Sequence, residues 1–361
     1  ARGAAASGCP CPAGSRSSVR AALRTLLTAP WPSQRDVRSC LQLLAVLQWV
    51  LSFLVLGVVS LVVLVYLVFT SFWPISALYL AWVILDWDTP EKGGRRLACL
   101  RRWPVWKHFR DYFPIQLVKT HELSPGHNYI IGSHPHGILC VGAFCNFTTC
   151  STGFLEMFPG IRPSLTTLAG NFRLPLFREY LMSGGLFPVT RQAIGYLLSK
   201  NGTGNAVAIV IGGASESLSC QPGVTTLILK NRKGFVRMAL EHGAHLVPSF
   251  SFGENDLFRQ VVFEEGSWMR SIQKRIQKMM GFAPCLFYGR GLLSVRSRGF
   301  LPFPKPITTV VGEPMTVPKI AAPSRETVDR YHELYVRALL KLFNDNKTKY
   351  GMAETDELRI V

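Results

Sequence analysis

Residues 206–217 read Ala-Val-Ala-Ile-Val-Ile-Gly-Gly-Ala-Ser-Glu-Ser, an unbroken apolar run followed by two glycines and a carboxylate. A short, continuous apolar run is typical of a strand buried on both faces of a parallel sheet. Such a strand carries Gly212, Gly213 and Glu216 to the carboxyl edge of the sheet, where ligands bind in open α/β folds. The stretch therefore predicts an α/β domain with a candidate site at that edge, although Glu216 alone also fits an ordinary helix-start carboxylate.

Strand and helix patterns recur on both sides of this stretch. Strand composition occurs at residues 128–131, 246–252 and 307–311, and helical patterns occur at 234–242, 267–280 and 325–344. Strands that alternate with helices favour a mostly parallel sheet with flanking helices. We expect this α/β domain to occupy residues 103–361.

The sequence His134-Pro135-His136-Gly137 follows the strand pattern at 128–131 closely. An imidazole at the end of a strand, with an ordinary pKa near 6.5, is suited to take up a proton at neutral pH. The His-x-His spacing can also supply two metal ligands, but no partner motif offers a third, so we expect no metal. Two structural histidines in a Pro-Gly turn are the alternative.

Two patterns near the Gly-Gly turn leave other chemistry open. Residues 213–217 match the G-x-S-x-G nucleophile elbow except that serine replaces the last glycine, so a hydrolase with Ser215 as nucleophile remains an alternative. Arg232, Lys233 and Arg237 stand at a glycine-led helix start, where cations bind phosphate or simply form a solvated face.

Residues 39–85 contain no acidic, basic or histidine residue. A membrane-spanning helix needs about 20 apolar residues, and Pro74 interrupts the run. We predict a hairpin with arms at 41–66 and 72–85, either two transmembrane spans or a re-entrant wedge; one span followed by a buried core helix is the alternative. Basic residues on both flanks favour cytoplasmic ends.

Positive charge lies outside that run. The chain has 40 Lys and Arg against 22 Asp and Glu, a formal charge of +18. This balance favours a membrane surface or a polyanionic ligand, and no nucleic-acid-binding module accompanies it. We divide the chain into a disordered basic tail (1–38), the membrane hairpin (39–85), a basic linker (86–102) and the α/β domain. A mitochondrial transit peptide is an alternative for the tail.

Residues 267–280 form an amphipathic pattern. Trp268, Ile272, Ile276 and Met279 share one helical face, and the cations lie mostly elsewhere. A basic amphipathic helix can lie in a bilayer interface. The alternative is a surface helix whose apolar face packs on the core.

Together these motifs resemble the diacylglycerol O-acyltransferase type 2 family, which includes monoacylglycerol and wax-alcohol acyltransferases. The resemblance rests on Tyr-Phe-Pro at 112–114, His-Pro-His-Gly at 134–137, Phe-Pro-Gly-Ile-Arg-Pro at 158–163, the Gly-Gly turn with its glutamate, and residues 232–254. Residues 53–56, Phe-Leu-Val-Leu, resemble the F-L-x-L element proposed for neutral-lipid contact, which implies that Phe53, Leu54 and Leu56 bind lipid.

The resemblance implies a mixed sheet like that of the glycerolipid acyltransferases and a membrane enzyme of the endoplasmic reticulum and lipid droplets. It implies transfer of a fatty acyl group from acyl-CoA to diacylglycerol, with acyl-CoA as co-substrate and no other cofactor; a homo-oligomer stays open. The chain departs from the related H-x-x-x-x-D motif, because Leu139 and Val141 occupy the two positions where the acid would stand.

Within this resemblance, His136 is expected to act as general base and Glu216 to hold its tautomer, while His134 and Gly137 shape the turn. The candidates for binding the CoA phosphates are Arg232, Lys233 and Arg237, with Arg162 and Arg173 as alternatives. Monoacylglycerol or a fatty alcohol are alternative acceptors. A serine-dependent lipid hydrolase and a non-catalytic lipid-droplet protein remain alternatives of other classes.

Overall fold

The computed structural model describes residues 33–361 except 293 and 295–296. Most of the predicted tail therefore lies outside the described residues. A helix, α2 (Gln34–Leu51), begins within the stretch that we assigned to the tail.

The centre of the fold is a seven-stranded sheet with the order β1-β11-β7-β2-β5-β3-β4. All neighbouring pairs are parallel except β11 with β7, so the predicted mixed, mostly parallel sheet is confirmed. The strands are β1 (Gln116–Lys119), β2 (Tyr129–His134), β3 (Arg162–Thr167), β4 (Leu186–Pro188), β5 (Asn205–Val210), β7 (His245–Phe252) and β11 (Thr308–Val311).

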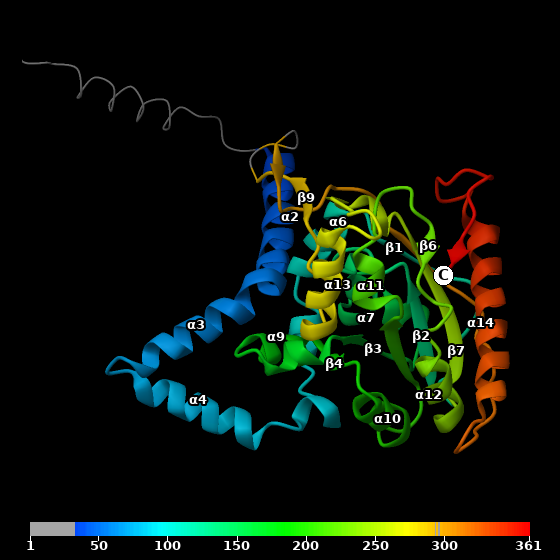
Figure 1. The fold of residues 1–361 in the computed structure, drawn as a ribbon, viewed down its shortest axis with the longest axis horizontal. Helices are drawn as coiled ribbons and strands as arrows, with labels where there is room; N and C mark the ends of the chain where they lie inside the picture. The colour runs from blue at the N-terminus through cyan, green and yellow to red at the C-terminus, as the bar shows by residue number, and fades with distance from the viewer. Residues whose placement is uncertain (1–32, 293, 295–296) are drawn as a thin grey trace, which may run out of the picture. The chain divides into compact units, whose positions relative to one another are not determined.

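Helices cover both faces of this sheet. Tyr129 and Ile131 of β2 enter one hydrophobic cluster and Ile130 enters the other, as the alternation of side chains along a strand requires. The first cluster includes α6 (Val105–Tyr112), α7 (Val141–Thr148), α8 (Phe154–Met157) and α9 (Phe177–Gly184). The second includes α10 (Arg191–Ser199), α12 (Gly234–His242) and α14 (Arg325–Asn346). Figure 1 shows α7 and α14 on opposite sides of β2 and β7.

Smaller elements complete the domain. These are α11 (Gly213–Ser217), α13 (Trp268–Met280), the 3₁₀ helices η3 (Ala169–Arg173) and η4 (Glu254–Asp256), and the short strands β6 (Thr226–Leu227), β8 (Arg259–Gln260), β9 (Phe287–Arg290), β10 (Arg298–Gly299) and β12 (Arg359–Ile360).

The apolar N-terminal region is helical. Helix α2 continues through a π-helical turn, η1 (Ser52–Leu56), into α3 (Gly57–Val68). Among the described residues, 34–68 is the one helix long and apolar enough to cross a membrane. The shorter α4 (Trp73–Leu85) follows a tight turn, and the Ser76 hydroxyl donates to Leu64 O at 2.7 Å, so α3 and α4 are in contact (Figure 1).

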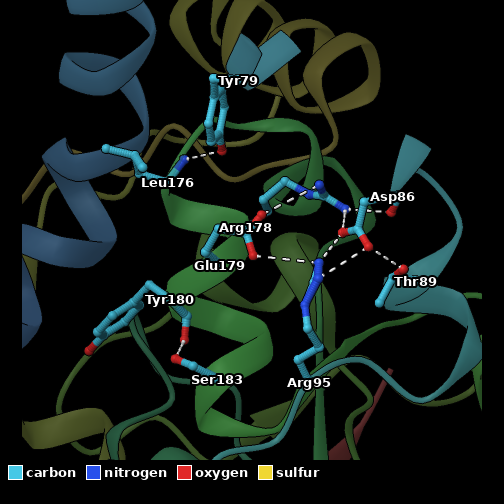
Figure 2. Close-up of polar contacts among 9 residues, drawn as sticks. All are labelled: Tyr79, Asp86, Thr89, Arg95, Leu176, Arg178, Glu179, Tyr180 and Ser183. Atoms are coloured by element: carbon cyan, nitrogen blue, oxygen red, sulfur yellow. Dashed lines mark hydrogen bonds and ion pairs between the residues drawn. The ribbon is translucent and has the colours of Figure 1, made fainter. Parts of the chain in front are cut away.

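A polar cluster joins the end of α4 to the α/β domain (Figure 2). Arg178 of α9 is only 1% exposed, and its Nη2 lies 3.0 Å from Asp86 Oδ2. Arg95 and Thr89 also donate to the Asp86 carboxylate. Residues 86–102, which the sequence assigned to a linker, contain two short helices, η2 (Thr89–Lys92) and α5 (Ala98–Arg101), and are fixed to the domain at Asp86.

Candidate active site

The His-Pro-His-Gly turn leaves the carboxyl end of β2. Gly137 has a φ of +63°, in the left-handed region that favours glycine. A Cβ atom at this position would lie 2.8 Å from Cγ of Glu254, so the turn also needs glycine for space. The backbone here is therefore held close to a buried carboxylate.

His134 belongs to the core. Its side chain is buried, and its Nε2 lies 3.0 Å from the Tyr335 hydroxyl oxygen on α14. That hydroxyl donates its proton to Gly132 O at 3.2 Å, so His134 Nε2–H is the donor to Tyr335. Burial lowers the pKa of His134 to about 3, and the neutral ring fixes the end of β2 against α14.

His136 instead lines a cavity of about 330 Å³. Its Nδ1 lies 2.7 Å from Ser217 Oγ and 3.2 Å from Gly137 O. Because a carbonyl oxygen only accepts, we assign the proton to Nδ1, which leaves Nε2 unprotonated, with the Cys140 Sγ 3.6 Å away. Burial lowers the pKa of His136 to about 4, so the imidazole is neutral at physiological pH.

Glu216 reaches the same turn, but it contacts the backbone and not the imidazole. Its Oε1 accepts from His136 N at 2.6 Å and its Oε2 accepts from Ile228 N at 2.9 Å. The prediction that Glu216 holds the tautomer of His136 is wrong, because Ser217, the next residue on α11, bonds to the ring. Burial raises the pKa of Glu216 to about 7.

The two glycines before α11 have different roles. A Cβ at Gly212 would lie 2.1 Å from Glu216 Oε2, so only glycine leaves room for the carboxylate. Gly213 has open space around it but a φ of +61°. Gly212 thus makes room for Glu216, and Gly213 permits the turn of the chain.

The walls of the cavity are mainly apolar. Phe53 and Leu54 of η1 line it together with Phe144, Leu165 and Phe287 of the domain. Leu56 packs against the hydrophobic cluster of that sheet face. The wall of the cavity therefore contains both a neutral imidazole and side chains of the apolar helix.

Glu254, beside the His-Pro-His-Gly turn, is a residue to which we assigned no role from the sequence pattern. Its carboxylate accepts from Val141 N at 2.7 Å and Gly142 N at 2.8 Å, at the start of α7. It is buried, which raises its pKa to about 7. The sequence signal for this contact was the pair of glycines at 137 and 142, because a Cβ at either position would lie within 3.0 Å of the Glu254 side chain.

The sequence profile of the diacylglycerol acyltransferase family matches residues 65–361. The chain belongs to this family. It is 58% identical over 347 residues to Diacylglycerol O-acyltransferase 2 of Danio rerio, covering 96% of each chain. It is 57% identical to the protein of that name from Homo sapiens, covering 96% of this chain and 89% of that one.

A second kind of relative is Diacylglycerol O-acyltransferase 2-like protein 6 of Bos taurus, 54% identical over 334 residues, covering 91% of this chain and 99% of that one. Among solved structures, 1-acyl-sn-glycerophosphate (LPA) acyltransferase PlsC of Thermotoga maritima matches with 12% identity and a TM-score of 0.36, covering 86% of this chain and 99% of that one. A TM-score this low establishes no shared fold.

The cations that we assigned to acyl-CoA in this family member do not gather at one place. Arg232 lies beside α11 and donates to Ser215 Oγ at 3.2 Å. Lys233 is paired with Asp329 of α14 at 2.7 Å. Arg173 stacks on the Trp87 ring at 3.7 Å.

Arg162 begins β3, whereas His136 follows the end of the parallel strand β2. The two residues therefore lie at opposite edges of the sheet, about 20 Å apart at 3.3 Å per residue. Arg162 donates to Asn201 O and Thr203 O there. The structure therefore does not bring Arg162 to the turn of His136, and its role as an acyl-CoA ligand stays a prediction. Arg232 contacts the Gly-Gly turn. Arg237 is half-buried on α12.

Ser215 does not contact His136. Its hydroxyl oxygen accepts from Arg232 and from Gln277 of α13 at 2.8 Å. The hydroxyl that bonds to the imidazole belongs to Ser217. The geometry therefore gives no support to the alternative of a Ser215 nucleophile.

Proposed function

We propose that this chain transfers a fatty acyl group from acyl-CoA to the free hydroxyl of diacylglycerol, giving triacylglycerol and CoA. The single observation that carries the proposal is that His136 lines an apolar cavity together with Phe53 and Leu54 of the apolar helix. The hydrogen bond to Gly137 O assigns the ring proton to Nδ1, which leaves Nε2 to act as the base. Membership of the diacylglycerol acyltransferase family supports the same acceptor.

In the proposed reaction, His136 Nε2 takes the proton of the acceptor hydroxyl as its oxygen attacks the thioester carbonyl. The tetrahedral intermediate then collapses and expels the CoA thiolate, which takes the proton back from the imidazolium. Ser217 Oγ accepts from Nδ1–H throughout and stabilises the charged ring. General-base catalysis of this kind contributes about 10²–10⁴-fold to the rate.

The remaining groups hold this arrangement in place. Glu216 fixes the His136 backbone through a 2.6 Å hydrogen bond. Arg232, exposed beside α11, is the candidate for the CoA phosphates, because a guanidinium binds phosphate oxygens well.

We also propose that α3 and α4 form a membrane hairpin with cytoplasmic ends. The predicted first arm, 41–66, is too long for this, because Val46, Trp49 and Val50 of α2 are buried in the hydrophobic core of the domain. The contact between α3 and α4 supports the hairpin, as does the exposure of apolar side chains on both helices, such as Val62 and Leu78. In this proposal the cavity lies beside the membrane in which diacylglycerol dissolves, as expected of an enzyme of the endoplasmic reticulum and lipid droplets.

The test supplies the purified full chain with labelled acyl-CoA and one acceptor at a time: diacylglycerol, monoacylglycerol, a fatty alcohol or water. We expect labelled triacylglycerol as the fastest-formed product. Labelled free fatty acid as the main product would instead indicate a hydrolase, and no turnover with any acceptor would indicate a non-catalytic protein. Faster reaction with monoacylglycerol or fatty alcohol would reassign the acceptor.

A further inference from the structure

Helix α13 exposes its apolar face. Trp268 is 71% exposed and Met279 is 75% exposed, and Ile272, on the same face, is also exposed. The alternative of a surface helix with its apolar face on the core is therefore wrong for these three residues. An exposed apolar face on a helix indicates a partner that covers it.

The polar side of α13 is the side that packs on the domain. Arg270 and Gln273 are buried, and Arg270 donates to Leu218 O at 2.9 Å and to Ser219 Oγ at 2.8 Å. Gln273 donates to Pro284 O at 3.0 Å, and Gln277 donates to Ser215 Oγ. These hydrogen bonds fix the helix without its apolar face, which stays available.

Cations flank the apolar face. Arg275 and Lys278 are exposed, and so is Lys274, which is paired with Glu265 at 2.6 Å. Long basic side chains beside an apolar face can keep their charges at the level of lipid headgroups while the apolar groups enter the acyl layer.

The exposed face continues to the cavity. Directly after α13, residues 281–283 line the cavity of His136, and Phe282 is itself exposed. Phe53 and Leu54, also in the cavity wall, belong to the apolar helix of residues 34–68. Two apolar surfaces of the chain thus meet at the same cavity.

We propose that α13 and Phe282 lie in the headgroup region of a phospholipid bilayer, with the cations on anionic headgroups, and bring the cavity to the membrane surface. The charge of the face and its continuity with the apolar helix favour lipid over a protein partner. The inference rests on the proposed membrane location, but its test reads fluorescence rather than acyl transfer, so the two can fail separately.

The test uses the full chain in vesicles of phosphatidylcholine and phosphatidylserine, with or without bromine on the lipid acyl chains. Bromine quenches tryptophan that enters the acyl layer. The difference between wild type and Trp268→Phe isolates the emission of Trp268, and we expect brominated lipid to remove most of it. Trp106→Phe is the control, because Trp106 is buried in the core and its difference signal should survive.

Two results would overturn the proposal. If aqueous iodide quenches the Trp268 signal and brominated lipid does not, the face lies in water. If neither quenches it, protein covers the face, for instance a second copy of the chain.

The proposed contact between the cations of α13 and anionic headgroups is tested by the double variant Arg275→Gln, Lys278→Gln. Quenching of Trp268 should then depend less on the phosphatidylserine content than in wild type. An unchanged dependence would remove anionic headgroups from the proposal. Both positions are exposed, so the fold should be retained, as circular dichroism can verify.

Discussion

His134 and His136 stand two residues apart in one turn, yet their surroundings differ. His134 is enclosed between β2 and α14 and bonds to Tyr335. His136 faces the apolar cavity and bonds to Ser217. Burial lowers the pKa of both rings, to about 3 and about 4, so the pKa does not distinguish them. Only His136 has access to the cavity, and on this difference we base the proposal that His134 is structural and His136 catalytic.

Replacing each histidine by glutamine tests this difference in role, and it has the largest expected effect on activity. His136→Gln should lower kcat by roughly 100-fold or more, because the base is lost, with little change in the melting temperature. His134→Gln should lower the free energy of unfolding by about 1–3 kcal/mol, because a buried hydrogen bond is disturbed, and should retain most of its activity. Equal loss of activity in two folded variants would contradict the division.

Substitutions in the Gly-Gly turn test whether Glu216 supports the backbone of His136. Gly212→Ala places a Cβ against the Glu216 carboxylate and should cost about 3 kcal/mol of stability and most of the activity. Gly213→Ala, its neighbour, meets open space and should cost only about 1–2 kcal/mol, the strain of a left-handed residue. Chemical denaturation and acyl-transfer assays measure both. If Gly212→Ala and Gly213→Ala lowered activity equally, Glu216 would have no special role in supporting His136.

The acid stability of the chain tests the burial of His134. Its pKa is lower in the folded chain than in the unfolded chain, so the folded state binds fewer protons and loses stability as the pH falls below 6.5. Between pH 7 and pH 5 this loss amounts to about 2 kcal/mol. His134→Gln should therefore lose less stability than wild type on acidification. A parallel loss in the two proteins would mean that His134 is not buried as a neutral ring.

Two serines of α11 test the orientation of His136. Ser217→Ala should lower kcat by about tenfold, the equivalent of one hydrogen bond of about 1.4 kcal/mol, without raising KM. Ser215→Ala is the matched control, and its activity should stay close to wild type. Loss of activity in Ser215→Ala alone, with labelling by serine-reactive probes, would restore the hydrolase alternative.

Tyr335→Phe tests the other histidine with the smallest effect. It removes the hydroxyl between His134 and Gly132 O and should lower the free energy of unfolding by about 1 kcal/mol. Activity should hardly change, because Tyr335 acts on the core side of the turn. Tyr331→Phe on the same helix is the control. A large fall in kcat for Tyr335→Phe would mean that His134 and His136 do not have separate roles.

Sequence patterns predicted the strands that build this site. The apolar runs at 128–131 and 206–211 became the neighbouring parallel strands β2 and β5, so the residues after them meet at one edge. That reasoning brought His136 and Glu216 together correctly. It did not apply to Arg162, which was named for its charge alone; Arg162 starts its strand and therefore lies at the opposite edge.

Other contacts depend on tertiary structure that no local pattern carries. The sequence pattern places both Glu216 and Ser217 just after the Gly-Gly turn. Which of the two side chains reaches the imidazole depends on the exact path of the chain at Gly212, which the pattern does not specify. The pairing of Asp86 with Arg178 joins segments far apart in sequence. For α13, periodicity identified the apolar face, but the hydrogen bonds of Arg270 decide that the polar face is the one that packs on the domain.

Direct transfer by His136 predicts that no acyl group is ever attached to the protein. Rapid mixing of the full chain with labelled acyl-CoA, without an acceptor, measures this. We expect no burst of CoA and no labelled protein, with CoA released only after diacylglycerol is added. A stoichiometric burst of CoA with label on Cys140, whose Sγ lies 3.4 Å from His136 Nδ1, would contradict direct transfer.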